Sequence, residues 1–160
     1  MPCFLFTWHT YASWMPDRPQ GYVHWERGLQ PSNPKLAQRY REQQKDTSVV
    51  FSAEQQQLLI GELRRSAELA TFRLHYVAFE PTHLHVLVSW HDARTYEQLR
   101  RSIRRSISLA LNRHGGQRRW LSRGESKRRV KDQSHFDYLI NKYLPDHGGW
   151  KWCERRGLWR

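Results

Sequence analysis

The sequence predicts an α+β fold: an antiparallel sheet with helices packed on one face. Three observations predict it. Apolar residues alternate with period two in three short stretches, they recur every three to four residues in three longer stretches, and these stretches follow one another as strand, helix, strand, strand, helix, helix. A grouping of this kind, with no regular strand–helix alternation, is typical of helices layered on an antiparallel sheet.

The strand-like stretches begin near the start of the chain. In residues 4–11, Phe4, Phe6 and Trp8 fall on one side of an extended chain, so a strand is expected there. Residues 73–79 and 83–90 predict two more strands, and the three residues between them are short enough for a hairpin or a close pair.

The helix-like stretches carry their own start signals. Ser52 with Gln55, and Thr95 with Gln98, have the spacing of a capping box, and each pair precedes an apolar stripe. The first stripe predicts a helix to about residue 71, and the second a helix that ends at Gly115-Gly116. A last helix is expected over 134–144, where apolar residues are spaced as one buried stripe.

The 160 residues suit a single domain with its own core. Residues 13–50, with four prolines and little periodicity, are expected to form an irregular surface excursion that contains one short helix at about 35–44. The tail 145–160 is aromatic and basic, and we expect regular structure to end at Pro145. No apolar stretch is long enough to span a membrane and no secretory signal is evident, so a cytoplasmic protein is expected.

Positive charge is the strongest global signal. The chain has 27 Lys and Arg against 15 Asp and Glu, and a pI of about 10.3, which favours a polyanionic partner such as nucleic acid. Thirteen of the 27 lie between Arg94 and Lys131, partly in a basic connector expected over 117–131. The predicted nucleic-acid contacts are Arg100, Arg101, Arg104, Arg105, Arg118, Arg119, Arg123, Lys127, Arg128 and Arg129.

Two histidines, His83 and His85, share one face of the third predicted strand because side chains alternate along it. They can offer two imidazoles to one divalent ion, while Leu84 between them is anchored in the core. A His-x-His pair by itself is more often a pair of ordinary surface or packed histidines. Glu80, just before the pair, either orients a ligand or caps the turn.

Longer motifs give this pair a context. FEPTHLHVLVSW, with histidine, hydrophobe and histidine in an apolar strand after a proline turn, resembles the HUH motif of single-tyrosine HUH nucleases. TWHTYASWMP…GYV, WLSRGESKRRVKD and YLPDHGGWKW are similar to segments of the smallest insertion-sequence transposases and of REP-associated tyrosine transposases. The resemblance covers most of the chain and implies a ferredoxin-like sheet, in agreement with the order of the elements.

The resemblance also implies a chemistry. In this family a helix-borne tyrosine attacks a phosphodiester of single-stranded DNA, and the HUH histidines with one polar side chain hold a divalent metal, Mg²⁺ or Mn²⁺. We expect Tyr143 as the nucleophile because His147, four residues on, can be the third ligand. Tyr138 stays open as an alternative, with Asn141 as its ligand. A DNA hairpin is the expected partner of a monomer or homodimer.

Two other functions compete with this hypothesis. A non-catalytic DNA- or RNA-binding domain of ferredoxin-like fold would also be basic and aromatic, although no RNP-like Lys/Arg-Gly-Phe signature is present. A zinc hydrolase is a weaker alternative, because the chain has neither an HExxH motif nor an obvious third zinc ligand close to the histidine pair in the sequence.

Overall fold

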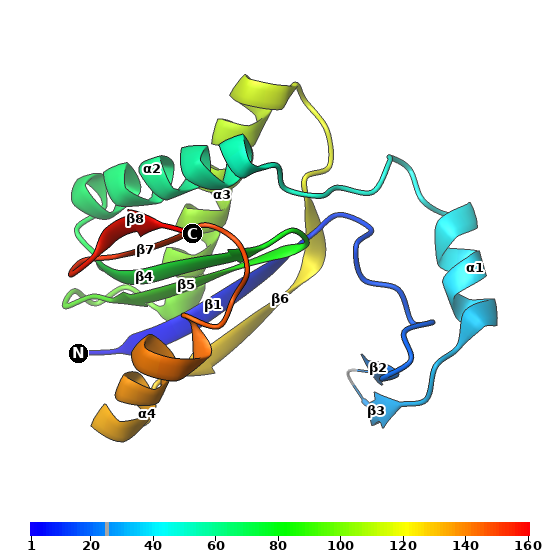
Figure 1. Cartoon of the computed structure of the whole chain (residues 1–160), viewed down its shortest axis with the longest axis horizontal. Helices are drawn as coiled ribbons and strands as arrows, with labels where there is room; N and C mark the ends of the chain where they lie inside the picture. Colours follow the sequence, from blue (N-terminus) through cyan, green and yellow to red (C-terminus); the bar gives the residue numbers. More distant parts are fainter. Residues whose placement is uncertain (25) are drawn as a thin grey trace.

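A computed structural model describes residues 1–24 and 26–160 and has an α+β fold. Six strands form one antiparallel sheet in the order β6-β1-β5-β4-β7-β8, and β2 pairs with β3 in a separate hairpin (Figure 1). The strands are β1 (Cys3–Thr10), β2 (Tyr22–His24), β3 (Gly28–Gln30), β4 (Arg73–Glu80), β5 (His83–Ser89), β6 (Leu121–Arg129), β7 (Lys151–Cys153) and β8 (Gly157–Trp159). The helices are α1 (Pro34–Glu42), α2 (Ala53–Leu69), α3 (Tyr96–Gly115), α4 (Gln133–Tyr138) and the π-helical η1 (Leu139–Tyr143).

The centre of the molecule is a ferredoxin-like βαββαβ unit. Its elements in chain order are β1, α2, β4, β5, α3 and β6, and its strands lie in the order β6-β1-β5-β4. Helices α2 and α3 pack on one face, where Phe6, Trp8 and Val86 from the strands meet Leu63 and Ile107 from the helices. Burial of this apolar layer is the main favourable contribution to the fold.

The opposite face carries a second, smaller apolar cluster. Leu5, Tyr76 and Leu87 of the sheet pack there against Leu139 and Leu144 of the C-terminal helical segment. The one-face arrangement expected from the sequence therefore describes the two long helices, whereas α4 and η1 lie on the other face (Figure 1). The final helix was predicted in the right place, and its stripe is buried against the sheet face that carries the histidines.

Both predicted helix starts are confirmed. The Ser52 and Thr95 hydroxyls each accept a hydrogen bond from the backbone N–H three residues on, and the Gln55 and Gln98 side chains each accept one from the backbone N–H of their cap. Each capping box satisfies N–H groups that lack partners inside the helix. The predicted hairpin of β4 and β5 is also confirmed, with its ladder running from Arg73–Ser89 to Glu80–His83.

Two expectations about irregular structure are wrong. Residues 121–129, expected inside a basic connector, form β6, because β1 has a second edge whose backbone groups it pairs. Charged side chains at such a sheet edge discourage pairing with other chains, so a basic composition suits an edge strand. Regular structure also continues beyond Pro145, because β7 pairs with β4 and β8 pairs with β7.

The excursion contains more structure than expected. It holds α1, close to the predicted helix, and the short β2–β3 hairpin, and both lie to the side of the main sheet (Figure 1). Position 25, inside this excursion, lies outside the described residues. Within the described part of the chain, none of the helices combines the length and the apolar character required to cross a bilayer.

Candidate metal centre and nucleic-acid interface

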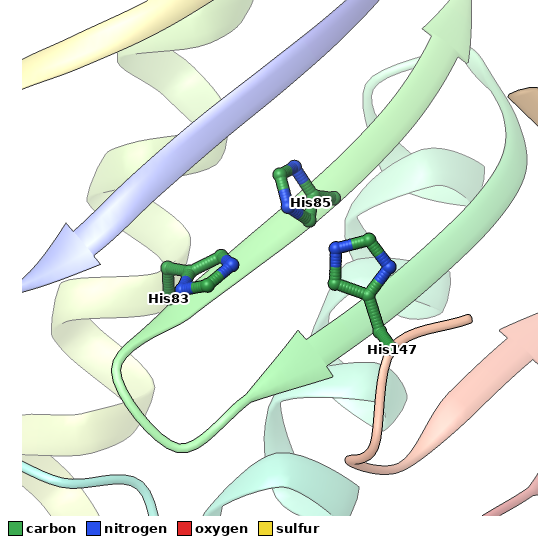
Figure 2. Close-up of side chains that lie close together, drawn as sticks. All are labelled: His83, His85 and His147. Atoms are coloured by element: carbon green, nitrogen blue, oxygen red, sulfur yellow. The ribbon is translucent and has the colours of Figure 1, made fainter. Parts of the chain in front are cut away.

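Three histidines converge on the sheet face opposite α2 and α3. His83 and His85 come from β5, and His147 comes from the loop before β7, so residues far apart in the sequence meet (Figure 2). One ring nitrogen from each of the three lies within 4.8 Å of those of the other two. At this spacing, small movements of the side chains would let all three nitrogens bind one ion.

His85 is the most enclosed of the three. Its side chain is buried, its Nδ1 lies 2.7 Å from the Thr7 hydroxyl on β1, and its Nε2 is buried without a partner. A buried polar atom without a hydrogen bond is costly unless a ligand takes it up. Burial lowers the pKa of His85 to about 2, and His147 and His83 contribute further. The imidazole is therefore neutral, as a metal ligand must be.

His83 and His147 show the same preference for a free Nε2. The Nδ1 of His83 lies 3.3 Å from the Thr82 hydroxyl, and the Nδ1 of His147 lies 3.2 Å from the Leu144 carbonyl, which can only accept a hydrogen bond. Burial, followed by the charges of His9 and His147, lowers the pKa of His83 to about 4. Partners of this kind fix the tautomer of metal-binding histidines in proteins.

The loop that carries His147 is tied down on both sides. Glu80 accepts a hydrogen bond of 2.7 Å from the Gly148 N–H. The buried Lys151 donates from Nζ to the carbonyls of His147, at 2.5 Å, and Gly149, at 3.0 Å. Gly149 passes so close to β4 that a Cβ there would lie 2.4 Å from the Phe79 carbonyl oxygen. Glu80 therefore fixes the position of the loop that carries His147.

Tyr143 lies beside the histidines. Its ring centroid is 5.4 Å from that of His85 and 5.1 Å from that of His147. Burial raises the pKa of its hydroxyl, although Arg128 works in the opposite direction. The expected helical turn from Tyr143 to His147 does not form, because Pro145 cannot continue a helix, but a turn brings His147 back to the tyrosine.

Tyr138, the alternative, lies further from the centre. Its ring stacks on Tyr143 at 6.4 Å, and it lines the same cleft as His83 and His147. Asn141, which would have served as its ligand, lines a different pocket, next to His75 and Phe136. The structure thus brings together Tyr143, His83, His85 and His147, whereas Asn141 lies elsewhere.

The donor set fits a divalent transition metal. Imidazoles bind zinc, iron, nickel and copper well, whereas Mg²⁺ prefers oxygen ligands and keeps several waters. Mn²⁺ accepts both kinds of ligand more readily than Mg²⁺ does. The orphaned Nε2 of His85 and the absence of a carboxylate from this three-residue cluster both favour a metal that tolerates nitrogen ligands.

Most of the predicted nucleic-acid contacts lie on the other side of the sheet from the histidines. Strand register places Arg128 opposite Leu5, on the histidine face, whereas Lys127 and Glu125 pair with Phe6 and Trp8 of the face covered by α3. Lys127 contacts Tyr96 there. The β6 edge is therefore basic on both of its faces.

The arginines of α3 differ in whether they pair with an acidic side chain. Arg100 and Arg104 pair with Glu125 at 3.1 and 2.5 Å, while Arg101 and Arg105 are exposed. Further along, one groove joins the end of β1 to α3 and the start of β6. This groove is lined by Tyr11, Ala12, Arg104, Ser108, Arg118, Arg119, Trp120, Leu121, Ser122 and Arg123.

Sequence reasoning missed Thr7 and Lys151. Thr7 alternates onto the histidine face of β1, and this was visible in the sequence, but the pairing of Thr7 with His85 depends on strand order. Lys151 gave no signal, because a lysine in a basic tail is ordinarily solvated.

The fold and the site thus define the class of protein: a ferredoxin-like antiparallel sheet with a candidate histidine centre on the face opposite α2 and α3. No family model matches the chain, and no curated protein is significantly similar to it in sequence. Among the solved structures that resemble the chain in fold, two are described as transposases.

The first is a REP-associated tyrosine transposase bound to a REP hairpin, with a TM-score of 0.48, 9% identity and coverage of 87% of this chain. The chain spans 62% of the length of that structure. The second is a transposase candidate from Deinococcus radiodurans, with a TM-score of 0.46, 12% identity and coverage of 89% of this chain and 88% of the other.

Proposed function

We propose that the chain is a transposase-like enzyme that cleaves and rejoins single-stranded DNA through a 5′-phosphotyrosine intermediate. One observation carries the proposal: Tyr143 shares a cleft with His83 and His147, and its ring centroid lies 5.4 Å from that of His85 and 5.1 Å from that of His147. A nucleophile beside a candidate metal centre is the arrangement that phosphodiester cleavage requires.

In the proposed reaction the Tyr143 Oη attacks a phosphorus atom in line with the leaving 3′ oxygen. A new phosphorus–oxygen bond forms to the tyrosine, the bond to the 3′ oxygen breaks, and that oxygen leaves as a hydroxyl. Because burial raises the pKa of Tyr143, the tyrosine keeps its proton at neutral pH and must lose it during the attack. Attack by another 3′ hydroxyl reverses the step and joins the strand without an external energy source.

His83, His85 and His147 would hold the divalent ion, Mg²⁺ or Mn²⁺, through nitrogens whose ring partners are already in place. When bound, the ion would supply positive charge to a non-bridging phosphate oxygen. Three imidazoles favour Mn²⁺ over Mg²⁺. We therefore expect Mn²⁺ to support the reaction at lower concentration than Mg²⁺.

The basic residues of α3, the following segment and β6 would hold the DNA, with a hairpin as the proposed form. Arg118, Arg119 and Arg123 line one groove, and Arg101 and Arg105 are exposed nearby on α3. Arg128 lies on the histidine face of β6, so the positive charge of this edge strand extends to that face. A strand bound along this basic edge would run from the groove toward the cleft, which Glu80 and Asp146 also line.

The test is formation of a covalent adduct. The probe is a pool of oligonucleotides, each with a hairpin next to a randomised single-stranded segment and a label at the 3′ end. A 5′-phosphotyrosine joins the labelled fragment to the protein, so we expect a labelled band that survives SDS. Mn²⁺ or Mg²⁺ should be required, EDTA should abolish the band, and Tyr143→Phe should abolish it as well.

The control is Tyr138→Phe, which removes a neighbouring hydroxyl and should leave the adduct. An adduct that survives Tyr143→Phe and disappears with Tyr138→Phe would move the nucleophile to Tyr138. Binding of the pool that is equally tight in EDTA, with no adduct under any metal, would contradict the enzyme and support a non-catalytic nucleic-acid binder instead.

A further inference from the structure

The end of the C-terminal helix has an unusual local geometry. Residues Leu139–Tyr143 are π-helical, and the Leu144 N–H donates to the Leu139 carbonyl, five residues back, at 2.9 Å. In an α-helix, positions five apart point about 140° away from each other around the axis. A π-helical turn holds more residues than an α-helical turn, so it brings positions five apart closer together around the axis, and such turns occur frequently at functional sites.

The π-helical turn decides where two tyrosines point. Tyr138 and Tyr143 are five residues apart, yet their rings lie side by side with centroids 6.4 Å apart and an angle of 26° between their planes. In an uninterrupted α-helix, Lys142 would occupy the position next to Tyr138. The turn therefore places two aromatic rings on one wall of the cleft that contains His83 and His147.

The two rings have different surroundings. Tyr143 packs against the small apolar cluster of the sheet face and against two of the histidines. Tyr138 belongs to neither apolar cluster, and 51% of its surface is exposed. Tyr138 therefore presents a solvent-exposed aromatic ring in the lining of the cleft.

The β4–β5 turn contributes to the same cleft. Pro81 and Thr82 of that turn, with His83, line the cleft together with Tyr138. Arg128 faces the same side of the sheet, where it can meet a phosphate. The cleft thus combines an exposed aromatic ring with the polar side chains of Thr82 and His83 and the carboxylates of Glu80 and Asp146, and Arg128 supplies a positive charge on the same side of the sheet. The ring suits one base of an unpaired strand, and Arg128 suits its phosphate.

We propose that Tyr138 is a stacking site for an unpaired nucleobase next to the phosphate that Tyr143 attacks. This assignment rests on the proposed function. Stacking uses the flat face that every base has, so it grips a single strand with little dependence on sequence. The base stacked on Tyr138 would extend the pair of tyrosine rings outward and align the adjacent phosphate with the Tyr143 hydroxyl.

The experiment separates the ring of Tyr138 from its hydroxyl. The probes are hairpin oligonucleotides whose unpaired flank carries 2-aminopurine at successive positions, and the protein carries Tyr143→Phe so that no cleavage occurs. We expect quenching of the 2-aminopurine at one position. Tyr138→Ala should abolish the quenching and raise the Kd about tenfold, within the range measured for loss of one stacked base. Tyr138→Phe should retain both.

Tyr40→Ala is the matched control, because Tyr40 is a similarly exposed tyrosine on α1, with 45% of its surface accessible. It should leave the Kd and the quenching unchanged. Tyr138 lies on the surface, so Tyr138→Ala should also leave the Tm unchanged, and a folding defect would be visible in that measurement.

Two outcomes would overturn the stacking site. Unchanged Kd and quenching in Tyr138→Ala would show that the ring is not used, and loss of both in Tyr138→Phe would show that the hydroxyl is what matters. The proposed function fails separately. Adducts on Tyr143, together with no effect of Tyr138→Ala, would support the proposed enzyme and contradict the stacking site. Binding that depends on the Tyr138 ring, without adducts, would support the stacking site and contradict the proposed enzyme.

Discussion

The Thr7 hydroxyl lies 2.7 Å from the Nδ1 of His85, across the β1–β5 ladder in which these two residues are direct partners. The hydrogen bond engages Nδ1, while the Nε2 of His85 is buried without a partner, in a cluster where one ring nitrogen of each of the three histidines lies within 4.8 Å of the others. Thr7 would thus position a ligand of the candidate metal centre without binding the ion itself.

Replacing Thr7 should weaken metal binding more than it weakens the fold. Thr7→Val keeps the shape of the side chain and removes the hydrogen bond to His85, and loss of such outer partners costs about 10- to 100-fold in metal affinity. Titration with Mn²⁺, followed by electron paramagnetic resonance of the free ion, measures the change. Thr10→Val is the control, because Thr10 bonds a backbone carbonyl and no histidine. Equal affinities in both variants would remove Thr7 from the site.

The loop that carries His147 should depend on Glu80. Glu80→Ala removes the acceptor for the Gly148 N–H, so we expect His147 to lose its fixed place and the Mn²⁺ affinity to fall by about tenfold or more. Glu80→Gln keeps an oxygen acceptor at the same place and should restore most of the affinity. If Glu80→Gln is as weak as Glu80→Ala, the charge of Glu80 matters rather than its hydrogen bond.

Acid should destabilise the fold partly through His75, which lies outside the histidine centre. Burial and the Arg73 charge lower its pKa from 6.5 to about 4, against the opposing charge of Glu154, and its Nε2 lies 2.7 Å from the buried Ser89 hydroxyl. The unfolded chain then binds more protons between these pH values than the folded chain does. The stability that depends on neutral His75 is complete above about pH 6.5 and is lost as the pH falls toward 4.

Thermal unfolding between pH 4 and 7, in EDTA, measures this effect. His75→Gln should flatten the fall of Tm across the window without removing it, because His83 and His85 have lowered pKa values as well. A pH profile of Tm with the same slope in His75→Gln and in the parent chain would show that His75 does not take up a proton on unfolding.

Much of the fold could be predicted from local pattern. The capping boxes at Ser52 and Thr95 and the alternation in β1, β4 and β5 depend only on neighbouring residues. Strand β6 could not, because its Arg- and Lys-rich sequence has no apolar face and its pairing with β1 is a long-range contact. The short strand β7 is likewise defined by its partner β4, and two adjacent glycines before it indicated only a loop.

The site divides in the same way. The shared face of His83 and His85 follows from strand alternation, and the position of Tyr143 follows from the helical stripe. The approach of His147 did not follow from the helical spacing used to predict it, since Pro145 interrupts the helix and the Glu80 and Lys151 contacts hold the loop instead. The π-helical turn that aligns Tyr138 with Tyr143 has no signature in the sequence that we could recognise.

Glu125 should weaken nucleic-acid binding. Its carboxylate, 15% exposed, pairs with both Arg100 and Arg104, so two of the predicted contacts are partly neutralised within the protein. Glu125→Gln frees both guanidinium groups for phosphates. We expect tighter binding of single-stranded oligonucleotides at low salt and a steeper dependence of the affinity on salt, by up to about 1.4 in the log–log slope for two additional phosphate contacts.

Binding measured at several salt concentrations tests this prediction, and Glu62→Gln is the matched control. Glu62 pairs with Arg65 on α2, so its replacement changes the net charge equally without touching the basic surface of α3 and β6. Equal slopes in the two variants would mean that only net charge matters. A steeper slope in Glu125→Gln alone would show that Arg100 and Arg104 reach phosphates once released, and that Glu125 limits the grip of this surface on nucleic acid of any sequence.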